Sequence, residues 1–263
     1  MKNSLAFLFL LLTISACQNG TDQKGKTVIA VSDTLTYTYD SVRVNSKNIP
    51  KQKVVDTPNA VISYPVFKND TLNQFIKRQV FNYFAKEEPV TSYQAIADSF
   101  IKGYDDFVST NKDTQQAWFL IIKINVLKQS ENYLALKYIH SDYAGGAHGN
   151  TTISFLNYNP KTNQEITLDS LIQTGKMATL TNIAEVIFRK NEKLNATESL
   201  EEKYFFDKGK FSLAQNFYVS NKGLVFLYNP YEIKAYAEGY TELIIPFEAI
   251  KNIARPNTIL TTQ

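Results

Sequence analysis

Polar and apolar residues alternate along several stretches of this chain and recur at helical spacing along others. Alternation among β-branched and aromatic residues is typical of strands. The predicted strands are 35–44, 60–67, 117–127, 133–140 and 151–158. Pro65 predicts that the second strand lies at an edge of the sheet or is bulged near its end. The third run, which includes Trp118, alternates most strongly, and we expect it to be the central strand.

Two amphipathic segments lie between the second and third predicted strands. Asn69 or Asp70 can cap the first of these helices, and Thr91-Ser92-Tyr93-Gln94 offers a capping box for the second. A longer helix is predicted from Met177 to Leu194. Strands and helices are therefore grouped and do not alternate strictly. This grouping predicts an α+β fold in which an antiparallel sheet packs with helices.

The chain begins with the features of an export signal. Lys2 is followed by an apolar run at 5–12 and then by small residues up to Cys17. Such a segment is too short to span a membrane, and we expect residues 1–16 to be removed as a signal peptide. The sequence Ile-Ser-Ala-Cys resembles the bacterial lipobox, which implies that Cys17 is lipidated and that two or more acyl chains hold the protein at a membrane. Residues 17–27 would then be a polar, lipidated tether.

Composition narrows the possible chemistry. Cys17 is the only cysteine, so its lipidation would leave no thiol for a disulfide, a zinc site or a nucleophile. The chain has 28 Lys and Arg against 25 Asp and Glu, and no block of basic residues interrupts this balance. We therefore expect no nucleic-acid partner. We therefore expect an exported bacterial lipoprotein of the cell envelope, whose one partner predicted from the N-terminus is the membrane that its lipid anchor reaches.

The segment Tyr-Ala-Gly-Gly-Ala-His-Gly-Asn at 143–150 concentrates glycine between two predicted strands. We interpret it as a structural loop, in which Gly145, Gly146 and Gly149 allow positive φ angles or the close approach of another segment. His148 is expected to hydrogen-bond a neighbouring segment. No dinucleotide-binding, Walker or nucleophile-elbow pattern is present in the chain. We accordingly predict no cofactor and no catalytic residue here.

A metal site is the alternative interpretation of this region. It would bring together His140, Asp142 and His148, with a further carboxylate from elsewhere. However, His140 shares a predicted strand face with Leu134 and Tyr138, where a half-buried, hydrogen-bonded histidine is the more common arrangement. We therefore expect no metal.

The C-terminal part combines a strand that starts at Gly223, an Asn-Pro-Tyr-Glu-Ile turn at 229–233 and an apolar final strand at 243–247. This pattern resembles the DUF3298 family. The preceding region, with Gly-Gly-Ala-His in a β turn, resembles the DUF4163 (PdaC-type) module. The resemblance implies two consecutive, tightly packed modules at 28–160 and 161–254, followed by a tail at 255–263.

The resemblance also sets expectations about activity. Related modules occur in the extracellular part of lysozyme-sensing anti-sigma factors and in the non-catalytic part of peptidoglycan deacetylases. In those deacetylases a separate NodB-type domain holds a metal with an Asp and two His that stand four residues apart. Here the two histidines, His140 and His148, stand eight residues apart. We therefore do not carry deacetylase activity over to this chain.

The favoured hypothesis is an envelope binding module for peptidoglycan, another glycan or a lysozyme-like protein. Tyrosines with nearby carboxylates suit sugar stacking or a basic partner. The candidate ligand-binding residues are Tyr231, Glu232, Tyr236, Glu238 and Tyr240. A structural explanation competes with this one, since these tyrosines, Tyr231 above all, could lock the turn onto the sheet. The alternative function is a glycan hydrolase that pairs Asp142 with Glu232 or Glu238.

Overall fold

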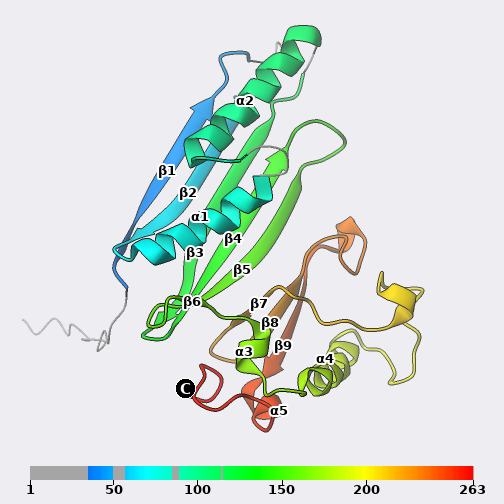
Figure 1. Cartoon of the computed structure of the whole chain (residues 1–263). Coiled ribbons are helices and arrows are strands. Elements are labelled where there is room, and N and C mark those ends of the chain that lie inside the picture. The colour runs from blue at the N-terminus through cyan, green and yellow to red at the C-terminus, as the bar shows by residue number, and fades with distance from the viewer. Residues whose placement is uncertain (1–34, 50–56, 85–88, 114, 263) are drawn as a thin grey trace, which may run out of the picture. The chain divides into compact units, whose positions relative to one another are not determined.

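Six strands pair in chain order into one sheet, and three later strands form a second (Figure 1). The computed structural model describes residues 35–49, 57–84, 89–113 and 115–262. The predicted signal peptide, Cys17 and the tether lie outside these residues. The strands of the first sheet are β1 (Tyr37–Asn45), β2 (Asn59–Phe67), β3 (Phe119–Ser130), β4 (Tyr133–Tyr143), β5 (Asn150–Asn159) and β6 (Gln164–Glu165).

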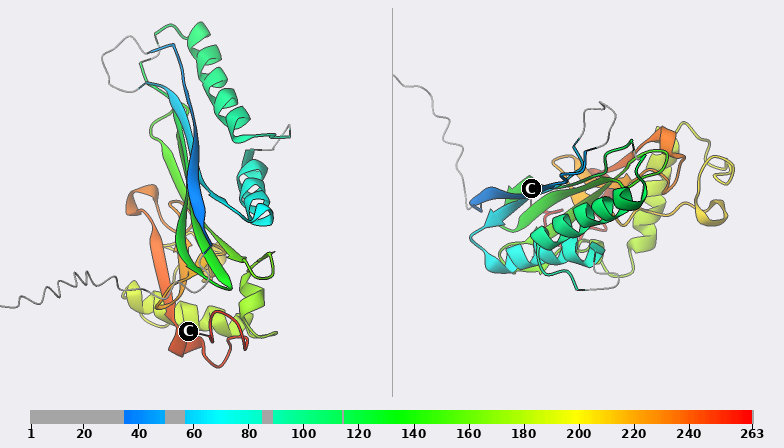
Figure 2. Two further views of the ribbon diagram at one scale, coloured as in Figure 1. Left: turned by 90° about the vertical axis from the view of Figure 1, so that its left-hand side faces the viewer. Right: turned by 90° about the horizontal axis from the view of Figure 1, so that it is seen from above.

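The predicted α+β class is confirmed, with one difference in strand direction. Neighbouring strands of the first sheet are antiparallel except for β2 and β3, which are parallel. The helices α1 (Asp70–Phe84) and α2 (Tyr93–Thr110) connect these two strands. Both helices lie on one face of the sheet (Figure 2). Because this connection returns the chain to the end where β2 began, β3 must run parallel to β2. The sheet is thus mostly antiparallel, as predicted, with one parallel pair.

Pro65 does not mark an edge strand, since β2 lies between β1 and β3. The pairing of β2 with β3 ends at Ser63, whereas its pairing with β1 continues to Phe67. At Pro65 the strand therefore has a neighbour on one side only, and a residue without an N–H group is tolerated there. The one register shift lies in β3, between Val126 and Lys128.

The third predicted strand is central, as expected, but it begins at Phe119. Trp118 lies just before it and is half-buried. Its ring packs against Phe100, Tyr104 and Phe107 of α2, with the Phe107 ring centroid 5.1 Å away. The helix begins one residue later than the capping box from Thr91 to Gln94 predicts. Its N-cap is Ser92, whose hydroxyl oxygen accepts a hydrogen bond of 3.0 Å from the N–H of Ala95.

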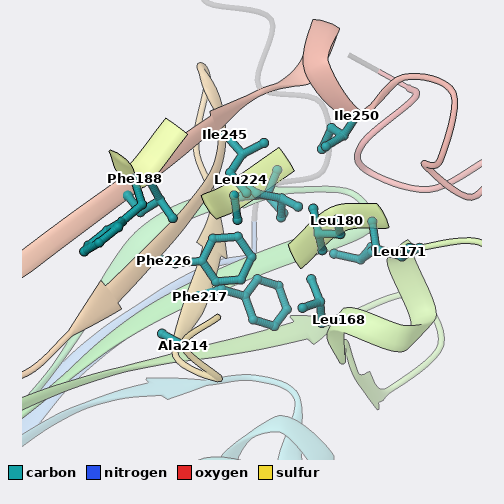
Figure 3. Close-up of a cluster of buried hydrophobic side chains, with 14 of the residues drawn as sticks. Leu168, Leu171, Leu180, Phe188, Ala214, Phe217, Leu224, Phe226, Ile245 and Ile250 are labelled. Atoms are coloured by element: carbon teal, nitrogen blue, oxygen red, sulfur yellow. The ribbon is translucent and has the colours of Figure 1, made fainter. Parts of the chain in front are cut away.

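The second sheet, with the helices around it, holds its own core (Figure 3). The remaining elements are α3 (Leu168–Leu171), α4 (Met177–Asn191), β7 (Phe217–Val219), β8 (Gly223–Tyr228), β9 (Thr241–Pro246) and α5 (Phe247–Ile250), with short 3-10 turns at Asp207–Gly209 and Tyr236–Glu238. Phe217 and Phe226 lie side by side in this core, with Leu180 of α4 nearby (Figure 3). No helix within the described ranges is both long and apolar enough to cross a membrane.

β4 connects the two cores because both of its faces are buried at the start of the strand. Leu134 and Leu136 belong to the core under α1 and α2, while Tyr133 and Ala135 belong to the core of the second sheet. The Tyr133 hydroxyl donates a hydrogen bond of 2.6 Å to Asn157 Oδ1 and accepts one of 2.7 Å from the N–H of Val219. A strand that is apolar on both faces is the expected consequence of packing between two layers.

Candidate binding site at the outer edge of β5

The outer edge of β5 is the first feature of the site. Strand β6 pairs with β5 only at Tyr158 and Asn159, so the remainder of this edge has no strand beside it. Every second residue of a strand directs its backbone groups to the same edge. Side chains from the C-terminal half bind these groups: Tyr236 OH donates to Gly149 O (3.3 Å), Tyr240 OH donates to Thr151 O (3.0 Å), Ile153 N donates to Asn229 Oδ1 (2.7 Å) and Phe155 N donates to Asn216 Oδ1 (2.8 Å). An edge that could pair with another chain is thereby closed.

Asn229 begins the turn that carries the candidate tyrosines. Its amide also donates to Ile153 O (3.1 Å) and to Glu232 Oε1 (3.2 Å), and its own N–H donates to Glu232 Oε2 (3.0 Å). Glu232 therefore fixes the turn. Tyr231 has a φ of 70°, which is uncommon for a residue with a side chain and costs roughly 1–3 kcal/mol. This conformation accompanies a ring that is 57% exposed.

Three aromatic rings line up beside this edge. The His148 ring stacks on Tyr236 with centroids 4.3 Å apart and planes 22° apart. Tyr236 in turn lies 5.4 Å from Tyr231, at an interplanar angle of 33°. We call His148, Tyr236 and Tyr231 the ring platform. Tyr240, also exposed, is held to the same edge by its hydroxyl group. The structure thus brings the 143–150 loop together with the candidate tyrosines, which are more than 80 residues away in the chain.

The tyrosines divide the structural role that the sequence suggested mainly for Tyr231, namely locking the turn onto the sheet. Tyr236 and Tyr240 attach the C-terminal half to β5 through their hydroxyl groups. The Tyr231 ring is the more exposed of the two exposed rings, at 57% against 40% for Tyr240, and its backbone N–H closes the turn by donating to Lys234 O at 3.1 Å. Tyr231 therefore offers a free ring, contrary to the expectation that it would be the main lock.

The glycines of the 143–150 loop serve two purposes. Gly145 and Gly146 have φ angles of 98° and 99°, where residues with side chains are strained. Gly149 lies so close to the preceding strand that a Cβ atom would be 3.1 Å from Asp142 O and 3.2 Å from Phe119 Cζ.

His148 is bound within its own loop. Its Nδ1 lies 2.8 Å from Gly149 O, which makes Nδ1 the donor. The expected hydrogen bond to a neighbouring segment is therefore not formed, and the stacking on Tyr236 provides the link to that segment.

His140 and Asp142 lie on the other face of β4, under α1. The His140 side chain is buried, against the rings of Tyr83 and Phe84, and its Nε2 lies 3.1 Å from Asp142 Oδ1. Burial lowers the pKa of His140 below 6.5, although the Asp142 carboxylate acts in the opposite direction. His140 is thus more deeply buried than expected, and its Nδ1 has no hydrogen-bond partner among the described residues.

The structure also places the other proposed chemical groups. No set of three or more His, Cys, Asp or Glu side chains is gathered for a metal ion within the part of the chain that the structure describes. Asp142 is engaged with His140, while Glu232 holds the Asn229 turn. The two carboxylates of the hydrolase hypothesis therefore each serve a local contact. Glu238 is exposed.

Sequence reasoning missed the asparagines that close the β5 edge. Asn216 donates its amide to Ile153 O (2.7 Å), the same oxygen that Asn229 reaches. The available signal was a pair of asparagines that flank the hairpin of β7 and β8 and are not part of either strand. Periodicity could not show which backbone groups they bind.

Comparison with known families supports this division of the site. The model named "Deacetylase PdaC" matches residues 52–151, and the model named "Protein of unknown function (DUF3298)" matches residues 169–248. The chain is therefore similar to a PdaC-type module over its first matched segment and to a DUF3298 module over its second. His148 falls in the PdaC-type match, whereas Tyr231 and Tyr236 fall in the DUF3298 match. The ring platform is therefore built by both modules.

Solved structures show the same fold. A crystal structure of a DUF3298 family member from Bacteroides fragilis has a TM-score of 0.67 and 23% identity, over 87% of this chain and 98% of that one. A DUF3298 family protein from Pseudomonas aeruginosa has a TM-score of 0.66 and 18% identity, over 88% of this chain and 98% of that one. No curated protein matches the sequence.

Proposed function

We propose that this chain is a glycan-binding protein of the cell envelope, exported and held at a membrane by lipid on Cys17. The ring platform is the proposed binding surface, and peptidoglycan is the proposed ligand. The lipobox-like sequence before Cys17 supports the location, and the kinship with envelope-related modules supports the class of ligand.

The observation that carries this proposal is the alignment of three rings at the junction of the modules. Sugar rings present apolar C–H faces, which pack well on flat aromatic faces. The His148 and Tyr236 rings stack on each other, with planes 22° apart, so their facing sides are covered and the exposed Tyr231 ring offers the open aromatic surface. The Tyr236 hydroxyl and His148 Nδ1 both donate hydrogen bonds to Gly149 O. Because these rings are held before a ligand arrives, binding would lose little side-chain entropy.

Apart from the exposed Glu238, the charges around the platform are engaged within the chain, which favours a sugar over a basic, lysozyme-like protein. Glu232 binds the backbone and amide of Asn229, and Lys234 pairs with Glu192 at 2.8 Å. These charged groups are satisfied within the chain, so they attract a basic partner weakly. Neutral hydroxyl groups of a glycan would meet the remaining polar atoms without a large desolvation cost.

Co-sedimentation with insoluble peptidoglycan tests the proposal. We expect Tyr231→Ala to weaken binding by about 0.5–1.5 kcal/mol, or roughly two- to tenfold, because it removes an exposed ring of the platform. Tyr39→Ala is the matched control, since Tyr39 is a tyrosine of similar exposure, 50%, on the opposite edge strand. It should bind like the parent.

Three results would contradict this proposal. Equal binding by the parent and Tyr231→Ala would remove the ring platform from the interaction. Capture of a lysozyme in place of peptidoglycan, lost in the same variant, would identify a protein ligand. Release of soluble glycan fragments that grows with time would show turnover, contrary to a binding function.

A further inference from the structure

A cavity lies at the opposite edge of the six-stranded sheet from the ring platform, between β1, β2 and α1. Its volume is about 230 Å³. Six residues define its character: Asp40, Tyr64, Pro65, Ile76, Lys77 and Tyr93. None of them belongs to the ring platform. The cavity therefore calls for its own explanation.

One wall of the cavity is aromatic and rigid. The rings of Tyr64 and Tyr93 stack with centroids 4.0 Å apart and planes 29° apart. Phe81 contacts Tyr93 edge-on, with centroids 5.2 Å apart, and so supports the stack from α1. Pro65 and Ile76, both buried, add an aliphatic surface. The cavity thus offers a fixed apolar surface for part of a ligand.

A carboxylate is held at the same cavity. Asp40 Oδ2 accepts a hydrogen bond of 3.2 Å from Tyr64 OH, and Asp40 Oδ1 accepts one of 2.7 Å from the N–H of Ser41. A carboxylate oxygen can accept more than one hydrogen bond. Asp40 is therefore fixed in place and can still receive a donor from a ligand.

An ammonium group from α1 also lines the cavity. Lys77 is half-buried and forms neither an ion pair nor a hydrogen bond with any residue in the described ranges. Asp40 and Lys77 thus line one cavity without pairing with each other. An ammonium group without a partner can be bound by a ligand group of opposite charge.

The size of the cavity limits the ligand. A dry cavity of about 150 Å³ accepts one benzene molecule, so a space about half as large again suits roughly nine non-hydrogen atoms. An aliphatic amino acid such as leucine has this size. It also carries an ammonium group, a carboxylate and an apolar side chain, which match Asp40, Lys77 and the Pro65–Ile76 surface.

We propose that this cavity binds a free α-amino acid with an aliphatic side chain. Asp40 and the Tyr64 hydroxyl receive the ammonium group, Lys77 receives the carboxylate, and the side chain packs on Ile76 and Pro65. This site is independent of the proposed glycan surface.

Titration of the purified full-length protein with three probes tests this site. L-Leucine carries both charges, L-leucinamide lacks the carboxylate, and N-acetyl-L-leucine lacks the ammonium group. We expect saturable binding of leucine and binding at least about tenfold weaker for each analogue. Lys77→Met should weaken leucine about tenfold and leave leucinamide unchanged. Asp40→Asn should weaken leucine and leave N-acetyl-leucine unchanged.

Lys68→Met is the control, because Lys68 is an exposed lysine on the turn before α1. It should retain the leucine affinity of the parent. Absence of leucine binding to the parent would overturn the proposal, and so would an equal effect of Lys77→Met on leucine and leucinamide. Tyr231→Ala should leave leucine affinity unchanged, so failure of this site and failure of the glycan proposal are distinguishable.

Discussion

Removal of the Asn229 side chain tests how the two modules are held together. Asn229 is 8% exposed and forms three side-chain hydrogen bonds, with Ile153 N, Ile153 O and Glu232 Oε1. In Asn229→Ala, Ile153 O retains Asn216 Nδ2 as a donor at 2.7 Å, and Glu232 retains the N–H of residue 229. The group left without a partner is the N–H of Ile153.

The expected loss of stability follows from this inventory. Leaving a buried donor unsatisfied costs about 1–3 kcal/mol, and Ile153 is only partly buried, so the lower half of that range applies. Asn216→Ala should cost a similar amount, because it leaves the N–H of Phe155 without its partner. The double variant additionally deprives Ile153 O of both its donors. It should therefore be less stable than the sum of the single effects by about 1 kcal/mol.

Urea denaturation of the four proteins measures this coupling. A non-additive loss, with both modules unfolding in one transition, is the expected result. Additive effects, or a loss below about 0.5 kcal/mol for Asn229→Ala, would refute the idea that asparagine side chains close the β5 edge.

Other residues give simpler predictions. Gly223→Ala should prevent folding, because a Cβ atom there would lie 2.0 Å from a backbone carbonyl oxygen of β9, and circular dichroism would show the loss. Gly145→Val should destabilise the protein by about 1–3 kcal/mol, and by more than His148→Ala, because φ at Gly145 is 98°; thermal denaturation compares the two. Because the pKa of His140 is lowered in the folded protein, the unfolded state takes up a proton first as the pH falls through 6.5. The free energy of unfolding should therefore decrease from about pH 6.5 down to the lower pKa of the native state. His140→Leu should flatten this decrease in pH-dependent denaturation, whereas His148→Ala should retain it. Cys17→Ser should abolish lipid attachment, and membrane fractionation that matches the parent would contradict the proposed anchor.

Local features were predictable from the sequence because they depend on neighbouring residues. The start of α2 to within one residue, its aromatic stripe and the alternation of β3 all follow from short-range spacing. The α+β class followed from the grouping of these elements. The parallel pairing of β2 with β3 did not, because it depends on where two helices return the chain. The edge position or bulge predicted from Pro65 was wrong for the same reason, because the position of β2 in the sheet depends on the same connection.

The ring platform was predictable only in parts. The exposed tyrosines and the glycine loop each stood out, but their meeting depends on the packing of two modules. Tyr236 and Tyr240 bind backbone oxygens of a strand about 90 residues earlier, which no periodicity encodes. Likewise, the burial of His140 beneath Tyr83 and Phe84 depends on how α1 crosses the sheet.

The most direct test of the glycan proposal uses the two histidines, the only ones in the chain. His148 belongs to the ring platform, whereas His140 is 4% exposed on the other face of β4. We would follow the imidazole Cε1–H resonances of untagged protein by NMR while soluble peptidoglycan fragments are added. If the ring platform binds glycan, the His148 resonance should shift saturably, the His140 resonance should not shift, and the response should be reduced in Tyr231→Ala. An unchanged His148 resonance at saturating fragment, or a shift confined to His140, would contradict it.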